Sequence, residues 1–185
     1  MRRHLEGKVC YVDATDIIQC GIREQRKLAQ LAGSISKTIA GHDCSVPEMT
    51  GTDTEHIRKY ITGLNSERAR IGMEIRMLDR YHEEMEYLLA EIERKIEFLS
   101  SCGNTELSKM ADVRKSELSL SHTVYTQMAI TAELAISRYS DFADVLKHAS
   151  QGMHAALTQS NAIEFIRIYE NVKKAAETCR IEKKG

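Results

Sequence analysis

Residues 54–101, TEHIRKYITGLNSERARIGMEIRMLDRYHEEMEYLLAEIERKIEFLSS, carry the pattern that decides the fold. Apolar residues return there at alternating steps of four and three, which is the spacing of a coiled-coil seam. The pattern lasts for about six heptads, and only Arg68 and His82 interrupt it. Its apolar members are Ile57, Ile61, Leu64, Ile71, Ile75, Leu78, Met85, Leu89, Ile92, Ile96 and Leu99. The stretch predicts one long helix.

A second seam follows after a very short break. Residues 105–158 repeat the same rhythm, with seam positions at Leu107, Ala111, Arg114, Leu118, Ser121, Tyr125, Met128, Ala132, Ala135, Tyr139, Phe142, Leu146, Ala149 and Met153. Gly103 can end the first helix in a left-handed conformation, and so short a connection reverses the chain. Folding about that glycine places Leu78 opposite Met128. The sequence therefore predicts an all-α fold with a long, coiled-coil-like antiparallel helical hairpin that turns at residues 102–104.

Two shorter helices are expected beside this hairpin, over residues 16–40 and 162–182. Residues 41–53, which contain the only proline, form the one clear loop. The second arm carries few charges between residues 118 and 158, and an extra apolar stripe of Val124, Leu134 and Val145 lies beside its seam. We expect the two shorter helices to cover that stripe.

The chain is expected to form a single elongated helical domain over residues 16–185, preceded by an N-terminal arm over residues 1–15. Val9–Val12 within the arm fits either a short strand or part of a helical or irregular segment. A strand would have to pair with another chain, because no second strand candidate occurs in the sequence.

The charge balance argues against nucleic acid or an anionic membrane as the main partner. The 26 basic and 27 acidic residues almost cancel, whereas both of those partners require a strongly positive surface. The N-terminus is too interrupted by polar residues to be a signal peptide. Five cysteines, an odd number with no CxxC pair, favour reduced thiols in a cytoplasmic protein.

No catalytic or cofactor motif stands out. Glycine-rich phosphate loops are absent, and Asp79-x-x-His82 is a single half of the paired motif that a di-metal bundle needs. His42 and Cys44, with Cys10 and Cys20 upstream, could supply zinc ligands, but their spacing matches no zinc-finger pattern. We therefore expect no enzyme activity, no cofactor, no metal and no small-molecule substrate.

Arg68 and His82 are the residues that the seam singles out, because both occupy positions where a coiled coil ordinarily places an apolar side chain. Folding about residue 103 puts Arg68 across from Tyr139 and His82 across from Tyr125. Buried polar residues in a seam can fix register and partner choice at some cost in stability. We expect these four residues to act on specificity rather than on chemistry.

The function expected from these features is structural. A hairpin with more apolar stripes than it can bury is typical of a scaffolding protein that self-associates or docks into a larger, for example filamentous, protein assembly. A helical-hairpin protein that remodels membranes is the alternative, although its long helices would need a basic face that this sequence lacks. A bundle enzyme or metal-binding protein is a third, weaker reading.

Overall fold

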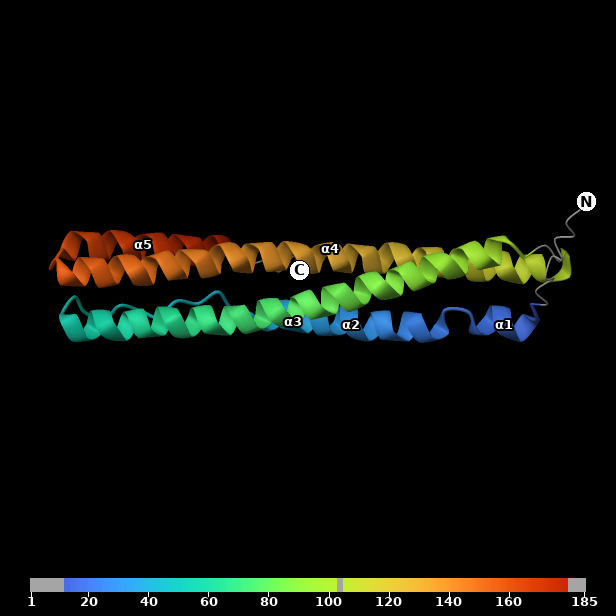
Figure 1. Ribbon diagram of the computed structural model, residues 1–185, viewed down its shortest axis with the longest axis horizontal. Coiled ribbons are helices and arrows are strands. Elements are labelled where there is room, and N and C mark those ends of the chain that lie inside the picture. Colours follow the sequence, from blue (N-terminus) through green and yellow to red (C-terminus); the bar gives the residue numbers. More distant parts are fainter. Residues whose placement is uncertain (1–11, 103–104, 180–185) are drawn as a thin grey trace, which may run out of the picture.

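Two long helices form the body of the molecule in a computed structural model that describes residues 12–102 and 105–179. Helix α3 (Thr54–Ser100) and helix α4 (Thr105–Thr158) run antiparallel and pack on each other more extensively than any other pair (Figure 1). At 1.5 Å per residue they extend for about 70 and 80 Å. No strand occurs within the described ranges. The all-α hairpin is confirmed, while the tip of its turn, at residues 103 and 104, lies outside the described residues.

The predicted seams form the core of this hairpin. On α3, side chains that are at most 3% exposed recur every seven residues, at Ile57, Leu64, Ile71, Leu78, Met85, Ile92 and Leu99. On α4 most seam positions are buried, and Leu107, Arg114, Ser121, Tyr125 and Met128 are half-buried. Asp53 caps the start of α3, where its carboxylate accepts hydrogen bonds from the backbone N–H groups of Glu55 and His56.

Two helices cover the end of the hairpin near its turn. Helix α1 (Ala14–Gln19) contacts α4, and helix α2 (Ile22–Gly41) contacts both α3 and α4. The predicted uninterrupted helix over residues 16–40 is wrong, because the chain breaks at Cys20 and Gly21. Gly21 has a φ of 83°, a left-handed conformation that costs other residues energy, and a Cβ there would clash with Leu118. The arm ends earlier than expected, since α1 begins at Ala14; residues 1–11 lie outside the described residues.

Helix α5 (Ala162–Cys179) covers the opposite end of the hairpin by packing against α4. Its buried side consists of Phe165, Ile168, Val172, Ala176 and Cys179. The Asn161 side chain accepts a hydrogen bond of 3.2 Å from the Glu164 backbone N–H, as expected of a cap. The expected last residues, 180–182, lie outside the described residues.

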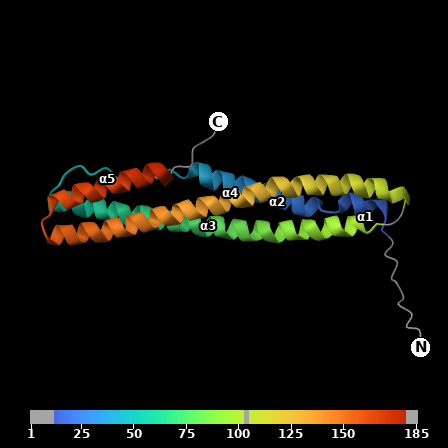
Figure 2. The ribbon, with the colours of Figure 1, turned by 90° about the horizontal axis from the view of Figure 1, so that it is seen from above.

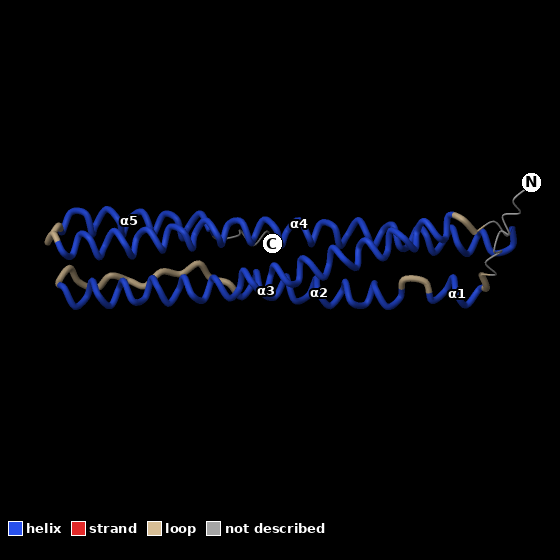
Figure 3. The backbone as a smooth tube through the Cα atoms, in the orientation of Figure 1, coloured by secondary structure: helices blue, strands red, loops and turns tan. Residues whose placement is uncertain are grey.

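The loop over residues 42–53 lies along the first half of α3 (Figure 3). Val46 and Met49 pack against the core. Pro47 approaches α3 so closely that a Cβ at Gly63 would lie 2.7 Å from the proline Cγ. The loop therefore acts as a further covering layer on the α5 half of the hairpin.

The result is an elongated bundle with two differently covered halves (Figure 2). One half combines the hairpin with α1 and α2, and the other combines it with α5 and the loop. The ends of α2 and α5 approach each other near the middle of the long axis. Among the described helices, none has the length and apolar character needed to cross a membrane.

Candidate functional site

The chemistry-bearing residues gather near the middle of the bundle, where α2 and α5 end. His42 follows the last residue of α2, Cys44 lies two residues further on, and Cys179 is the last residue of α5. One ring nitrogen of His42 and the two sulfur atoms all lie within 4.8 Å of one another. Within residues 12–102 and 105–179, this is the one group of three or more His, Cys, Asp or Glu side chains arranged to hold a metal ion.

Cys44 and Cys179 are joined by a disulfide, with their Cα atoms 6.2 Å apart. The expectation of reduced thiols is wrong for this pair, whereas Cys20 and Cys102 carry free thiols. The two bonded cysteines are separated by 135 residues, so no local spacing could reveal them. They meet because α5 folds back along α4 and the loop lies along α3.

His42 is held in a fixed orientation by its surroundings. Its side chain is 0% exposed, and its Nδ1 atom lies against the Oε2 atom of Glu74. The ring of Tyr139 packs on it with ring centroids 4.2 Å apart. The other ring nitrogen, Nε2, is buried without a hydrogen-bond partner. Burial lowers the pKa of His42 below its ordinary value, and the Glu74 carboxylate offsets only part of that effect. The imidazole is therefore neutral at neutral pH.

Arg70 links this histidine to the rest of α3. Its guanidinium binds the Glu74 carboxylate at 3.0 Å and the Glu67 carboxylate through two contacts. A further N–H donates to the backbone carbonyl of Asp43 at 2.8 Å. The hydrogen bond to Glu67 is the main cause that raises the pKa of Arg70. The arginine thereby fixes both the carboxylate behind His42 and the backbone between His42 and Cys44.

The four residues predicted to set specificity are distributed differently from the expectation. Arg68 is exposed, so its predicted core position is wrong. His82 is half-buried, with a side chain 26% exposed and an ion pair of 3.9 Å to Glu86. Tyr125 is half-buried against the core. Tyr139 is buried, and burial raises its pKa to about 12. Its ring neighbour is His42. The role of these residues in register stays a prediction.

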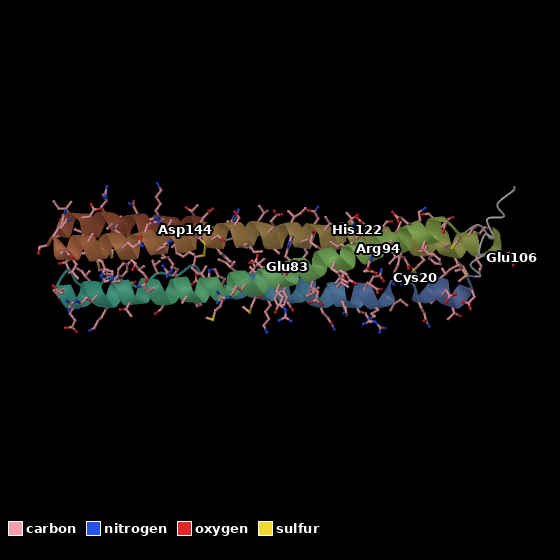
Figure 4. All side chains as sticks on the ribbon, viewed as in Figure 1. Cys20, Glu83, Arg94, Glu106, His122 and Asp144 are labelled. Atoms are coloured by element: carbon pink, nitrogen blue, oxygen red, sulfur yellow. A yellow bond between two sulfur atoms is a disulfide. The ribbon has the colours of Figure 1, made fainter. Side chains whose placement is uncertain are left out.

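The cysteines upstream of the loop do not join the cluster. Cys10 lies outside the described residues, and Cys20 lies toward the α1 end of the bundle (Figure 4). The Cys20 carbonyl accepts a hydrogen bond from Arg114 at 2.8 Å, and burial raises the pKa of its thiol. His42 and Cys44, which the sequence analysis considered together, do lie in one cluster, and its third member, Cys179, is a residue that the sequence could not indicate.

The outer face of α4 is a second notable region. Met110, Val113, Leu120, Val124 and Leu134 are all exposed there, and the exposed fraction reaches 68% at Leu120. The expectation that α2 and α5 would cover the extra stripe is wrong for Val124 and Leu134, each 56% exposed. Val145 is half-buried, as expected. At Met110 and Val113 the exposed face of α4 borders an apolar groove of about 540 Å³, which Ile17, Ile18 and Ile22 line from the opposite side.

Comparisons with protein families, curated proteins and solved structures give no match to this chain. Its function must be inferred from the two regions described above.

Proposed function

We propose that this chain is a structural protein that self-associates through the outer face of α4. The observation that carries the proposal is a row of eight exposed side chains on that helix, defined here as the α4 stripe. Five of them are apolar (Met110, Val113, Leu120, Val124 and Leu134) and three are polar (Glu117, Gln127 and Thr131). Soluble proteins rarely expose a contiguous apolar surface larger than a few hundred Å² unless it contacts a partner.

The spacing of the α4 stripe supports a helical partner. Its members follow one another at steps of three and four residues from Met110 to Leu134, which is the repeat that a coiled coil requires. At 1.5 Å per residue the stripe extends for about 36 Å along the helix. All eight positions are exposed, so a second helix can reach them without any rearrangement of the bundle.

The order of residues in the stripe supports a second copy in the antiparallel direction. A two-fold axis at His122 would pair Leu120 with Val124 of the second copy, and Met110 with Leu134. The same axis would place Glu117 opposite Gln127, where an amide can donate to a carboxylate. A parallel, in-register dimer would instead bring two Glu117 carboxylates together, which is unfavourable in a partly buried seam.

His122 lies at the midpoint of the α4 stripe in sequence, but its side chain is not part of the stripe. Its Nε2 atom forms an ion pair of 3.0 Å with Glu93 of α3, and Figure 4 shows it on α4 beside the stretch of α3 that carries Arg94. The histidine is thus held within its own hairpin. The centre of the proposed interface is left to Leu120 and Val124.

The proposal is tested by measuring the mass of the full chain in solution by sedimentation equilibrium over a range of concentrations. We expect a dimer, and we expect Leu120→Glu with Leu134→Glu to shift it to monomer. Each buried leucine contributes about 1.5–3 kcal/mol, so each substitution should weaken association by roughly tenfold or more.

Ile163→Glu is the matched control. Ile163 is 81% exposed on α5, away from the stripe, so its replacement should leave the mass unchanged. A wild-type chain that remains monomeric at the highest concentrations would refute self-association. Equal loss of the dimer in the control would place the interface elsewhere.

A further inference from the structure

The cluster at the middle of the bundle has the donor set of a zinc site. Thiolate sulfur and neutral imidazole nitrogen are the ligands that Zn²⁺ most often takes in proteins. Cys44, Cys179 and His42 present two sulfurs and one nitrogen within 4.8 Å of one another. Cys44 and Cys179 are buried and the His42 side chain is fully buried.

The separation of the donors suits a tetrahedral ion. Zinc–sulfur bonds of about 2.3 Å and zinc–nitrogen bonds of about 2.0 Å place ligand atoms roughly 3.5 to 3.8 Å apart in a tetrahedron. That spacing falls within the 4.8 Å limit observed here. Once the disulfide is reduced, the two sulfurs would have to separate from bonding distance to about 3.8 Å to make room for the ion.

The surroundings of His42 match those of a metal-binding histidine. Such histidines usually direct one ring nitrogen to a carboxylate and the other to the metal. Here Nδ1 lies against Oε2 of Glu74, and both ring nitrogens are buried without a well-formed hydrogen bond, so Nε2 has neither a carboxylate nor any other partner beside it. Arg70 fixes Glu74 at 3.0 Å. An unsatisfied buried nitrogen is costly in a folded protein, and a metal ion would satisfy it.

We propose that His42 and the reduced thiols of Cys44 and Cys179 bind one Zn²⁺ ion, and that the Cys44–Cys179 disulfide is the oxidised, metal-free state of the same site. Three protein ligands leave one position of the tetrahedron for water or another small ligand. Glu74 acts as a positioning residue for His42.

The exchange between the two states balances with a thiol reductant. Two equivalents of a small thiol transfer two electrons and two protons to the disulfide, which yields two cysteine thiols and the disulfide of the reductant. Binding of Zn²⁺ then displaces one proton from each thiol into solvent. Oxidation by a small disulfide reverses the process and releases the ion.

Both states would join the same two segments. Cys44 belongs to the loop between α2 and α3, and Cys179 ends α5. The disulfide ties these segments under oxidising conditions, and the zinc ion would tie them under reducing conditions. The structural consequence is that α5 stays docked on the hairpin in either environment.

The test uses the full chain, reduced with a phosphine, freed of metal with a chelator, and titrated with Co²⁺ and then Zn²⁺. We expect one Co²⁺ per chain, with the visible bands of tetrahedral coordination and a thiolate charge-transfer band, and displacement of the cobalt by Zn²⁺. The oxidised chain should show neither band. Zinc should also raise the melting temperature of the reduced chain but not of the oxidised chain.

Variants separate this site from the other thiols. His42→Ala, Cys44→Ser and Cys179→Ser should each abolish tight binding, and Glu74→Gln should weaken it roughly 10- to 100-fold, as is typical of residues that orient a ligand. The matched control replaces Cys10, Cys20 and Cys102 together by Ser and should bind Co²⁺ as the wild type does. Circular dichroism of each variant establishes that the helices remain folded.

Three results would overturn the proposal. The first is a folded, reduced chain that binds no Co²⁺ or Zn²⁺. The second is equal binding by the folded His42→Ala variant, and the third is loss of binding in the triple control. Because metal content is measured per chain, none of these outcomes depends on whether the chain forms a dimer.

Discussion

Arg70 contacts two carboxylates and a backbone carbonyl from one turn of α3. Arg70 binds the carboxylates of both Glu67 and Glu74, so its guanidinium compensates two negative charges. Because these two side chains are only 12% and 15% exposed, solvent would screen their repulsion poorly without it. The guanidinium also restrains the loop at Asp43. One side chain thus connects the longest helix to the segment that carries His42 and Cys44.

We expect Arg70→Gln to destabilise the folded chain by about 1–2 kcal/mol, a value that allows for the partial exposure of the arginine. The neighbouring Arg68→Gln is the matched control and should change stability by no more than about 0.5 kcal/mol, because Arg68 is exposed. Urea unfolding of both variants measures the difference. Equal effects would show that the charge of this turn matters rather than the contacts of Arg70.

The seam pattern singled out Arg68, but the arginine that makes the inward contacts is Arg70. The seven-residue repeat correctly identified the most buried side of α3. Which residues are buried on the neighbouring side of the helix depends on the segments that cover it. Here the rings of Tyr60 and Tyr169 of α5 have centroids 5.5 Å apart, and Glu74 contacts His42. Those neighbours turn Glu67 inward and leave Arg68 in solvent. The periodicity of apolar residues within one helix cannot predict these neighbours from other segments.

His82, predicted to occupy a seam position, is half-buried, and its effect can be tested alone. The side chain is 26% exposed, and its ion pair to Glu86 is long at 3.9 Å. We expect His82→Leu to preserve or raise the melting temperature, because an apolar residue suits this position, while the register or the oligomeric state becomes less specific. Thermal melts and native mass measurements test both parts. A large loss of stability with unchanged assembly would contradict the specificity role.

At the scale of the element, the break between α1 and α2 is produced by a contact with another helix. Gly21 immediately precedes α2 as its N-cap in a left-handed conformation, and the chain there lies directly on Leu118 of α4. A helical apolar stripe continues across the break, so the sequence favoured one helix. Gly21 and Gly33 both lower the helix propensity of this stretch, but only the approach of α4 explains why the chain bends at Gly21 and not at Gly33.

Replacement of Gly21 and of Gly33 by Ala should therefore change the stability of the folded chain in opposite directions. Gly21→Ala should destabilise by about 1–2 kcal/mol from the left-handed backbone alone, and more because the methyl group would meet Leu118. Gly33 lies within α2 with nothing near its missing Cβ, so Gly33→Ala should stabilise by about 1 kcal/mol. Thermal or urea unfolding of the two variants checks the signs. Stabilisation by Gly21→Ala would mean that α1 and α2 can form one continuous helix.

At the scale of the whole molecule, the hairpin was predictable because both arms carry their own repeat and the turn is short. The contacts between distant segments were not. The link between Cys44 and Cys179 requires α2 and α5 to end at the same level of the bundle, and the exposure of Val124 and Leu134 depends on how far α2 and α5 extend. Both follow from helix lengths and packing directions, which the local sequence does not fix.

Removal of the Cys44–Cys179 link should loosen one half of the bundle more than the other. The disulfide closes a segment of 135 residues in sequence, so it restricts the unfolded chain strongly and is worth about 2–5 kcal/mol. We expect Cys44→Ala with Cys179→Ala, compared with the oxidised wild type in the presence of a chelator, to lose about that much stability.

The amides of α5 should show the largest increase in hydrogen-exchange rate, because α5 packs chiefly on α4 and is tied by its last residue. The amides of α2 should change less, since that helix contacts both α3 and α4. Cys20→Ala with Cys102→Ala is the control, because both thiols are free. Exchange that accelerates equally in α2 and α5 would show that the bundle unfolds as one unit, and that the link stabilises it globally instead of holding α5 in place.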